Sequence, residues 1–583
     1  MVRSAANTPY EPSKADMAAL DIPVSPETSP AISDRRNLNR APQLNQDTRR
    51  FEQLIEIGIA LSSEHSHERL LERILEEAMA VGNADGGTLY VVEEEHEDEL
   101  RFVILRNISL DLAFGGTSGN PIIFPPLRLH DAGTGVPNYA NVATASALSK
   151  RIINIPDAYT AAGFDFSGTR KFDSQTGYKS VSFLTVPLLN ARKELVGVLQ
   201  LINSRDSNGN NIPFQPENER LISALASQAA AALENNKLFR QQRKLLEAFI
   251  EVIARAIDAK SPYTGGHCQR VPVLTKMLTK VACDSTAEPF ADFNLSEEEW
   301  YELHIAAWMH DCGKITTPEH VVDKATKLET IWDRIDLVKS RMEILRRDAK
   351  IAYLEAMTQP NADSPSLKEN YDRQVKDLDE EFKFLETINI GGESMAETDL
   401  ARLQKISQQV WVDAGGKNQP LLTENEVYNL SVKRGTLTAE EREIVNDHIV
   451  QTIGMLEQLP FPKHLRRVPE YAGGHHEKMN GTGYPRGLKK DQMSIPARAM
   501  AIADIFEALT ARDRPYKKPK TLSESIRIMA NMKRNHHIDP DLFDLFLQTG
   551  IWREYAQQFL LPEQVDEPDI AAALEAKPNP PQA

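Results

Sequence analysis

The pattern of apolar and polar residues divides the chain into a strand-rich part followed by a long helical part. An amphipathic helix is expected first, with an apolar face made by Phe51, Leu54, Ile55 and Ile59. Five runs rich in β-branched and aromatic residues then predict strands at 87–92, 101–108, 151–155, 180–189 and 195–202. Strands and helices together predict an α/β domain over residues 50–236.

One long helix is predicted from Glu217 to Lys260. Its apolar positions are spaced by 7, 3, 4 and 4 residues, at Phe239, Leu246, Phe249, Ile253 and Ile257. Such a stripe is either part of an intramolecular core or the seam of a parallel two-stranded coiled coil. Because this helix connects two domains, we expect the coiled coil, and with it a homodimer in which a change of helix packing carries a signal.

Two further apolar stripes predict a helical hairpin within residues 330–434. The first stripe contains Trp332, Ile335, Val338, Met342 and Leu345, and the second contains Tyr371, Val375, Leu378, Phe382 and Leu385. A Pro/Ser/Asn-rich break at 359–366 separates them, so the two helices are expected to be antiparallel.

Composition limits the class of protein. The 583 residues are 41% hydrophobic and 26% charged, which is typical of a chain with two to four soluble domains. The net charge of −17 disfavours binding to a nucleic acid polymer or an anionic membrane. No membrane span or signal peptide is expected, and three cysteines indicate a reducing compartment, so we expect a cytoplasmic protein. Segments 1–48 and 562–583 lack apolar periodicity and are expected to be disordered.

Histidines provide the strongest chemical signal. The run from His475 to Pro485 reads HHEKMNGTGYP, and His310 begins the run HDCGK. Adjacent imidazoles, and imidazole next to carboxylate, suit first-row divalent metals such as Fe, Mn and Zn. A lone histidine is more often structural, and we interpret His304 in that way. Cys312 is interpreted as a small apolar core residue rather than a ligand.

Two capping boxes predict where histidine-bearing helices begin. Ser296-x-x-Glu299 starts a helix that ends near His310, with Gly313 as its expected stop. Thr438-x-x-Glu441 starts another, which would place His448 about two turns further along.

Over roughly residues 245–530, in a domain expected to span 245–545, the chain resembles the HD-GYP family, a branch of the HD metal-dependent phosphohydrolases whose members hydrolyse cyclic di-GMP. The resemblance is carried by the two histidine runs, by Lys433–Glu441 followed by His448, and by the segment IADIFEALT around Asp504. It implies an all-α domain with two divalent metal ions, Fe or Mn, held by His267, His310, Asp311, His448, His475, His476 and Asp504.

The same resemblance implies roles in catalysis. Asp311 would bridge the two metals, which activate a bridging hydroxide for in-line attack on phosphorus. Lys314 would contact a substrate phosphate, and further substrate contacts are expected from Arg514, Lys517, Gly483, Tyr484 and Pro485. The Gly-Tyr-Pro loop is also a surface for a signalling protein partner in the family.

Three features depart from the family pattern. Tyr263 occupies the position at which some members have a Glu that binds a third metal, so two metals are favoured. Asn480 replaces a common Asp, and its side chain is expected to cap the loop in the same way. The segment 330–434 is an insertion of roughly 100 residues, which we expect either to cover the site or to form a dimer contact.

Residues 50–236 resemble a GAF sensor domain. The similarity lies in INIPDAY at 153–159, TGY at 176–178, VPL at 186–188 and LVGVLQLIN at 195–203. Lys171–Asp173, Asn203 and Phe214 are similar to residues of cyclic-nucleotide-binding members, but Asn218 and Glu219 fit that pattern imperfectly. The GAF ligand is therefore unknown, and a GAF domain without ligand is an equal alternative.

Taken together, these features predict a bacterial GAF-regulated phosphodiesterase in which helix 217–260 connects the sensor to the catalytic domain. The expected reaction converts cyclic di-GMP to linear pGpG, and a further cleavage to GMP is left open. Two alternatives stand beside it: a phosphohydrolase for another cyclic dinucleotide or nucleotide, and a catalytically silent signalling scaffold.

Overall fold

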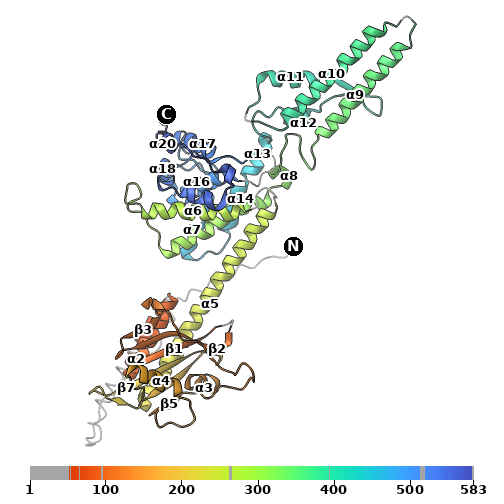
Figure 1. Cartoon of the computed structure of the whole chain (residues 1–583). Coiled ribbons are helices and arrows are strands. Elements are labelled where there is room, and N and C mark those ends of the chain that lie inside the picture. Colours follow the sequence, from red (N-terminus) through yellow and green to blue (C-terminus); the bar gives the residue numbers. More distant parts are fainter. Residues whose placement is uncertain are drawn as a thin grey trace, which may run out of the picture. The chain divides into compact units, whose positions relative to one another are not determined.

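The structure is a computed structural model in which residues 52, 54–64, 66–93, 96–260, 266–360, 362–392, 394–511 and 519–580 are described. The chain forms two compact units, one ending at Gln241 and the other beginning at Gln242 (Figure 1). The segment 1–48 lies outside the described residues. None of the described helices is long and apolar enough to cross a membrane.

The first unit is built on an eight-stranded antiparallel sheet. Its main path runs in the order β3-β2-β1-β7-β6-β5, with β4 paired to β2 and β8 to β7. The strands are β1 (Ala84–Glu93), β2 (His96–Asn107), β3 (Leu112–Gly115), β4 (Leu127–Arg128), β5 (Ile153–Ile155), β6 (Phe183–Leu189), β7 (Leu195–Arg205) and β8 (Asn211–Ile212). All five strands expected from the sequence are confirmed. The short strands β3, β4 and β8 were not predicted.

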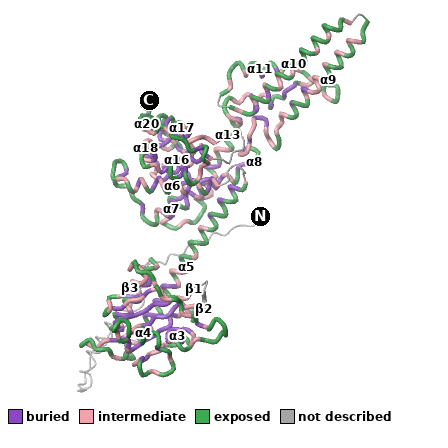
Figure 2. The backbone as a smooth tube through the Cα atoms, in the orientation of Figure 1, coloured by how far each residue is buried: buried purple, intermediate pink, exposed green. Residues whose placement is uncertain are grey.

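Helices complete the core of this unit. They are α2 (His67–Gly82), α3 (Val142–Ser149), α4 (Ser167–Thr176) and the first part of α5 (Pro216–Lys260). Leu71, Ile74 and Leu75 of α2 are buried with Ile222 and Leu225 of α5 and with the sheet. Figure 2 shows buried residues, in purple, along the strands of this unit. Period-3.6 spacing on both helices explains this packing.

The face predicted for the helical residues 54–63 is partly wrong. Ile57 and Leu61 are buried, whereas Ile55 and Ile59 are exposed, and Phe51 is not described. The buried face includes Gly58, where an added Cβ would lie 3.0 Å from the Gln228 side chain. A close approach to α5 therefore selects this face, and apolar spacing alone did not reveal it.

Helix α5 confirms the predicted long connecting helix, but some of its apolar residues pack in the core whereas others are exposed. Ile250, Ala254 and Ile257 are buried in the core of the second unit, and Ile257 is only 3% exposed. Phe249, by contrast, is 58% exposed. The predicted stripe is therefore wrong at Ile257, which packs within the chain.

The second unit is almost entirely helical around one large core. Its helices include α6 (His267–Asp284), α7 (Glu297–Met309), α8 (Glu319–Val322), α13 (Ala439–Asn446), α14 (His448–Glu457), α15 (Val468–Gly473), α16 (Ile495–Thr510), α17 (Leu522–Arg534), α18 (Pro540–Thr549), α19 (Ile551–Phe559) and α20 (Ile570–Leu574). Short 3-10 turns connect several of them, among them η2 (Cys312–Thr316) and η5 (Pro562–Gln564). Helix α6 packs along α16 and α7, so three site-bearing helices share the core (Figure 1).

The predicted insertion has a small core of its own. It contains the expected hairpin α9 (Ile335–Met357) and α10 (Ser364–Asn389), followed by α11 (Glu397–Ser407), β9 (Val410–Val412), β10 (Asn418–Pro420) and α12 (Glu424–Leu430). Val338, Met342 and Leu385 of the predicted stripes are buried, together with Leu403 and Ile406. Trp332 is exposed, so the first stripe begins after it.

The predicted disorder of the C-terminal segment is wrong for its described residues. Residues 562–564 form η5, and α20 buries Ala573 in the main core. The Lys533 ammonium donates to the Leu574 carbonyl at 2.9 Å, which fixes the helix end. Small alanines provide this burial, and they give little periodic signal in a sequence.

Candidate metal centre

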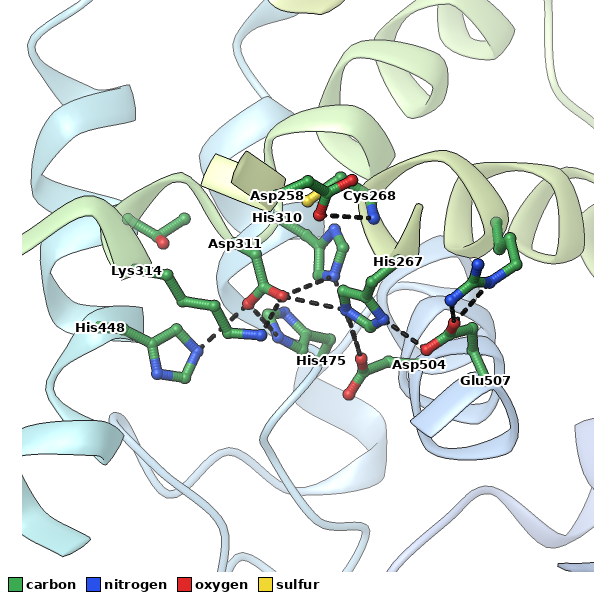
Figure 3. Close-up of polar contacts among 12 residues, drawn as sticks. Asp258, His267, Cys268, His310, Asp311, Lys314, His448, His475, Asp504 and Glu507 are labelled. Carbon is green, nitrogen blue, oxygen red and sulfur yellow. Dashed lines mark hydrogen bonds and ion pairs between the residues drawn. The ribbon is translucent and has the colours of Figure 1, made fainter. Parts of the chain in front are cut away.

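Seven side chains converge in the second unit in two groups that share one carboxylate. Within each group the possible ligand atoms lie within 4.8 Å of one another. One group is His267, His310, Asp311 and Asp504, and the other is Asp311, His448, His475 and His476. Figure 3 shows the Asp311 carboxylate between His267 and His448. The structure thus brings together all seven residues that the sequence indicated.

Helix ends deliver most of these side chains, whereas Asp504 lies inside α16. His267 is the first residue of α6, and His310 caps the C-terminus of α7, which begins with the predicted Ser296/Glu299 capping box. The predicted Thr438/Glu441 box starts α13, but that helix ends at Asn446 and a new helix, α14, begins at His448. His448 is therefore placed by a helix start and not along a continuous helix.

Backbone carbonyls fix the orientation of three imidazoles. Nδ1–H of His310 donates to Ala307 at 2.8 Å. In the same way, Nδ1–H of His448 donates to the Val445 carbonyl at 2.5 Å, and Nδ1–H of His475 donates to the Ala472 carbonyl at 2.6 Å. Each ring then presents its Nε2 lone pair towards Asp311, as metal-binding histidines require.

The buried atoms at the centre lack other partners. His310 Nε2, His475 Nε2 and Asp311 Oδ1 are buried and have no hydrogen-bond partner among the described residues. His448 Nε2 lies 3.3 Å from Asp311 Oδ1, and His475 Nε2 lies 3.9 Å from it. Orphaned polar atoms in a protein interior are costly. Divalent cations held by these atoms would remove that cost, so the donor set fits two metal ions.

The electrostatics of three of the clustered groups favour metal-binding protonation states. Burial lowers the pKa of His475 to about 4, helped by His310, and lowers that of His476 well below its ordinary value, helped by His475. Burial alone would raise the pKa of Asp311, but Lys314 and His310 outweigh it and hold this pKa well below its usual range. Neutral imidazole and ionised carboxylate are the forms that bind metals. His267 differs: burial alone would lower its pKa, but Glu507, Asp311 and Asp504 outweigh it and raise this pKa well above its usual value, so His267 would lose a proton on binding metal.

Lys314 lies directly beside this carboxylate. Its Nζ is 2.5 Å from Asp311 Oδ2, and although partial burial alone would lower the pKa of this lysine, the nearby Asp311 and Asp504 charges outweigh it and raise this pKa. A permanent positive charge at the rim of the ligand cluster is suited to an anionic substrate.

Sequence reasoning missed a carboxylate that holds His267. Glu507 is almost fully buried, and its Oε2 lies 2.5 Å from Nδ1 of His267, while Arg270 binds its Oε1 at 2.6–2.7 Å (Figure 3). The available signal was its spacing of three residues from Asp504 on α16, which places both carboxylates on one helix face. A single Glu on a helix gives no such indication by itself.

The Gly-Tyr-Pro loop folds back on the ligands. The Tyr484 ring stacks on His476 at 4.9 Å with an interplanar angle of 16°. Buried Glu477 accepts from the Arg486 and Leu488 amides and closes the loop. Asn480 caps the turn through the Thr482 amide at 3.0 Å, which confirms the role expected for it. Gly483 approaches the backbone so closely that an added Cβ would lie 2.4 Å from the Lys478 nitrogen.

Other predicted residues lie elsewhere. Arg514 and Lys517 are outside the described residues, so their substrate contacts stay a prediction. His304 is exposed and is not part of either group, and Cys312 is in the apolar core, as interpreted from the sequence. Gly313 does not stop α7, because it lies within η2.

In the first unit, two of the residues that resemble a nucleotide-binding GAF pattern, Asp173 and Asn203, bond within the domain. Asp173 accepts from the Ser180 amide and hydroxyl and from the Tyr159 hydroxyl. Asn203 is fully buried and holds the Val181 amide at 2.7 Å. These bonds show a scaffold role, while the GAF ligand stays unidentified.

Comparisons with known proteins identify the two domains. The GAF domain family matches residues 66–233, and the HD domain family matches residues 424–542. The chain therefore contains a GAF domain followed by an HD domain, which confirms the two resemblances seen in the sequence. The HD match begins near the end of the insertion and includes His448, His475, His476 and Asp504, so the insertion separates it from the three earlier residues of the cluster.

Three relatives have names that state an activity. A 3'3'-cGAMP-specific phosphodiesterase of Vibrio cholerae is 26% identical over 335 residues, which are 56% of this chain and 45% of that protein. A cyclic di-GMP phosphodiesterase of Thermotoga maritima is 38% identical over 20% of this chain and 31% of its own length. A cyclic di-GMP phosphodiesterase of Pseudomonas aeruginosa is 40% identical over 21% of this chain and 28% of its own. The chain thus spans less than half the length of each.

Among solved structures, the GAF domain of an Acinetobacter phosphoenolpyruvate-protein phosphotransferase aligns with 33% of this chain and 95% of its own, at 16% identity. The TM-score of 0.24 is too low to support an argument.

Proposed function

We propose that this protein is a metal-dependent phosphodiesterase that hydrolyses cyclic di-GMP to linear pGpG. One observation carries the proposal: two groups of largely buried His and Asp side chains share Asp311, and three of their buried atoms lack a hydrogen-bond partner in the part of the chain that the structure describes. Two closely spaced divalent ions on such a ligand set activate water and neutralise phosphoryl charge during in-line displacement. Names of relatives as cyclic dinucleotide phosphodiesterases support the same class of reaction.

The chain's own groups have separate tasks in this reaction. His267, His310 and Asp504 would hold one ion, His448, His475 and His476 the other, and Asp311 would bridge them. Lys314 would bind a phosphate oxygen, since its charge is permanent and its ammonium is at the cluster. Tyr484, which stacks on His476, would form one wall of the substrate site together with Gly483 and Pro485. Arg514 and Lys517 would bind the second phosphate of the substrate.

Fe or Mn is the proposed metal. Five imidazoles and two carboxylates form the donor set, and no described cysteine belongs to it. Mixed N/O ligation without thiolate suits Fe and Mn and disfavours a structural zinc site, which commonly uses cysteine. Catalytic zinc uses the same donors, so the metal analysis also measures Zn.

The proposed enzyme is a cytoplasmic homodimer whose activity depends on the GAF domain. All three cysteines are unpaired, in agreement with a reducing compartment. Exposed apolar residues follow α5 at spacings of 7, 4 and 3 residues, at Leu238, Leu245, Phe249 and Val252. This heptad-like row is the seam that a parallel coiled coil of two copies would bury. The exposed Pro485 and Arg486 would be available to a signalling partner.

The test is metal analysis and hydrolysis on the same anaerobically purified sample. We expect about two Fe or Mn per chain and release of pGpG from cyclic di-GMP, with both lost in Asp311→Ala because the shared ligand is removed. His304→Ala is the matched control, since this histidine is outside both groups. Names that specify 3'3'-cGAMP make that dinucleotide the second substrate to assay.

Two results would contradict the proposal in different ways. If the protein binds metal and hydrolyses 3'3'-cGAMP but not cyclic di-GMP, it is still a cyclic-dinucleotide phosphodiesterase, but the proposed substrate is wrong. A protein without metal after reconstitution, and without hydrolysis, would favour the silent scaffold.

A further inference from the structure

The last turn of α5 contacts the two backbone segments that carry key groups of the metal centre. Asp258 and Lys260 are in this turn, and both belong to the second unit. Asp258 lies against the first turn of α6, the helix that begins at His267 (Figure 3). Lys260 lies against η2, the turn that follows Asp311 and contains Lys314.

Asp258 serves as the missing cap of α6. The N-cap of that helix is Gly266, which has a φ of +85° and no side chain to accept from the first amides. Asp258 Oδ2 accepts from the Gly266 amide at 3.1 Å, and its Oδ1 lies 3.5 Å from the Cys268 amide. A carboxylate at this helix end also meets the positive end of the helix dipole. His267 lies between the two bonded amides, so Asp258 fixes the backbone of a proposed ligand.

Lys260 binds three carbonyls at the C-terminal end of η2, two within the turn and one on its C-cap residue Thr317. Its ammonium donates to the carbonyls of Lys314 at 3.4 Å, of Ile315 and of Thr317 at 2.7 Å. Three donors on one ammonium match three acceptors, so the Lys260 ammonium is fully engaged by this end of the turn. On its other side, the Gly313 amide donates to Thr452 Oγ1 of α14 at 2.9 Å. The turn that carries Lys314 is thus held between α5 and α14.

We propose that Asp258 and Lys260 are positioning residues through which α5 controls the metal centre, Asp258 by placing His267 and Lys260 by placing Lys314. The inference rests on the proposed function, because it concerns the same site. α5 is one continuous helix that begins in the GAF unit. A rotation or shift of its last turn must move both segments or break charge-assisted hydrogen bonds, which are stronger than neutral ones. The two residues thereby act on different steps: Asp258 on metal affinity and Lys260 on substrate.

The experiment compares three full-length variants with the wild-type protein. Asp258→Ala removes the cap, Lys260→Met keeps the length of the side chain without its donors, and Arg255→Met is the matched control. Arg255 is exposed on the same helix, and its contact is a 3.8 Å ion pair with Glu251. Each protein is stripped of metal and titrated with Mn²⁺ by calorimetry, after which kcat and KM for cyclic di-GMP are measured.

The expected results separate the two residues. Asp258→Ala should weaken one of the two Mn²⁺ sites by about tenfold and leave the other unchanged, as outer-shell changes do. Lys260→Met should bind both ions normally but raise KM roughly tenfold, because a displaced Lys314 contacts phosphate poorly. Lys260→Arg should restore KM, since guanidinium also donates to carbonyls. A structural defect alone would not produce this division between metal affinity and KM.

Other outcomes would overturn the inference. If Asp258→Ala and Lys260→Met match Arg255→Met in both measurements, the two contacts do not position the site, although the proposed function stands. If Asp258→Ala does not fold, Asp258→Leu takes its place, because this side chain is of similar size and cannot accept either bond. Unchanged Mn²⁺ affinity in a folded Asp258→Leu would refute the Asp258 part. A wild-type protein that binds no Mn²⁺ would instead remove the proposed function itself.

Discussion

Asp311 is the residue on which both halves of the proposed metal centre depend. One of its oxygens lies 3.1 Å from His267 Nε2 and 3.3 Å from His310 Nε2, and the other lies 3.3 Å from His448 Nε2. An ionised carboxylate buried without a partner would be costly, and the Lys314 ammonium is close to only one of the two Asp311 oxygens. The arrangement is therefore most stable with cations between these atoms, which explains why it is built from so many neutral donors.

Glu507→Gln should weaken the metal site on the His267 side. The carboxylate holds His267 Nδ1–H and is itself held by Arg270, so its charge increases the basicity of the ligand. We expect Mn²⁺ affinity to fall about tenfold, in line with other outer-shell substitutions. Calorimetric titration measures it, and Glu443→Gln, an exposed glutamate on α13, is the control. Equal affinity in both variants would show that Glu507 has only a structural role.

Gly313→Ala should unfold or strongly destabilise the second unit. An added Cβ would lie 1.9 Å from the His448 carbonyl oxygen and 2.6 Å from the Thr452 amide, and both belong to backbone that cannot move without displacing α14. We expect a loss of about 3 kcal/mol or more in the free energy of unfolding. Chemical denaturation of the variant measures this loss.

Gly454→Ala is the matched control for that substitution. Gly454 is also on this part of the chain, inside α14, but an added Cβ would meet no atom within 4 Å. Alanine there should stabilise the helix by about 0.5–1 kcal/mol. A mild effect at Gly313 similar to that at Gly454 would mean that the close approach of η2 to α14 does not exist in solution.

At the scale of helices and strands, local sequence signals were sufficient to predict where helices begin. They were insufficient to predict which helix face is buried and where a helix ends. Capping boxes at Ser296 and Thr438 are side chain to backbone bonds within four residues, so a sequence reveals them. The helix that begins at His448 packs closely against η2, which lies more than 130 positions earlier in the chain, and no local signal in the sequence reveals such a contact. Paired histidines and the family resemblance indicated all seven clustered residues. Glu507 and Asp258 were missed because single acidic residues on helices are usually solvated.

The exposed row on α5 should form a dimer interface. Phe249→Glu places a charge in the centre of that row, so we expect the protein to become monomeric while its fold is retained, because Phe249 is 58% exposed. Light scattering coupled to gel filtration gives the mass. Lys244→Glu is the control, since Lys244 is exposed about 140° around the helix from Phe249. A wild-type monomer, or a dimer in both variants, would rule out this interface.

At the scale of the whole molecule, the metal centre joins segments that the insertion separates in sequence. His267, His310 and Asp311 precede it, and His448, His475, His476 and Asp504 follow it. The insertion has a separate core, and buried Lys324 contacts Glu441 at 2.7 Å where the two flanks meet. The flanks can therefore stay in register although roughly 100 residues intervene. Whether the insertion covers the site or contacts a second copy stays a prediction.

Metal should stabilise one unit of the chain and not the other. The two units have separate cores, so we expect two thermal transitions in the full-length protein. Ligand at about a hundred times its dissociation constant adds roughly 2.7 kcal/mol to the unit that binds it. Mn²⁺ added to chelator-treated protein should then raise the midpoint of one transition by about 5 °C. Calorimetric scans of wild type and Asp311→Ala measure this, and the shift should vanish in the variant because both proposed ions share that ligand. A shift of both transitions, or the same shift in Asp311→Ala, would place the bound metal outside this cluster.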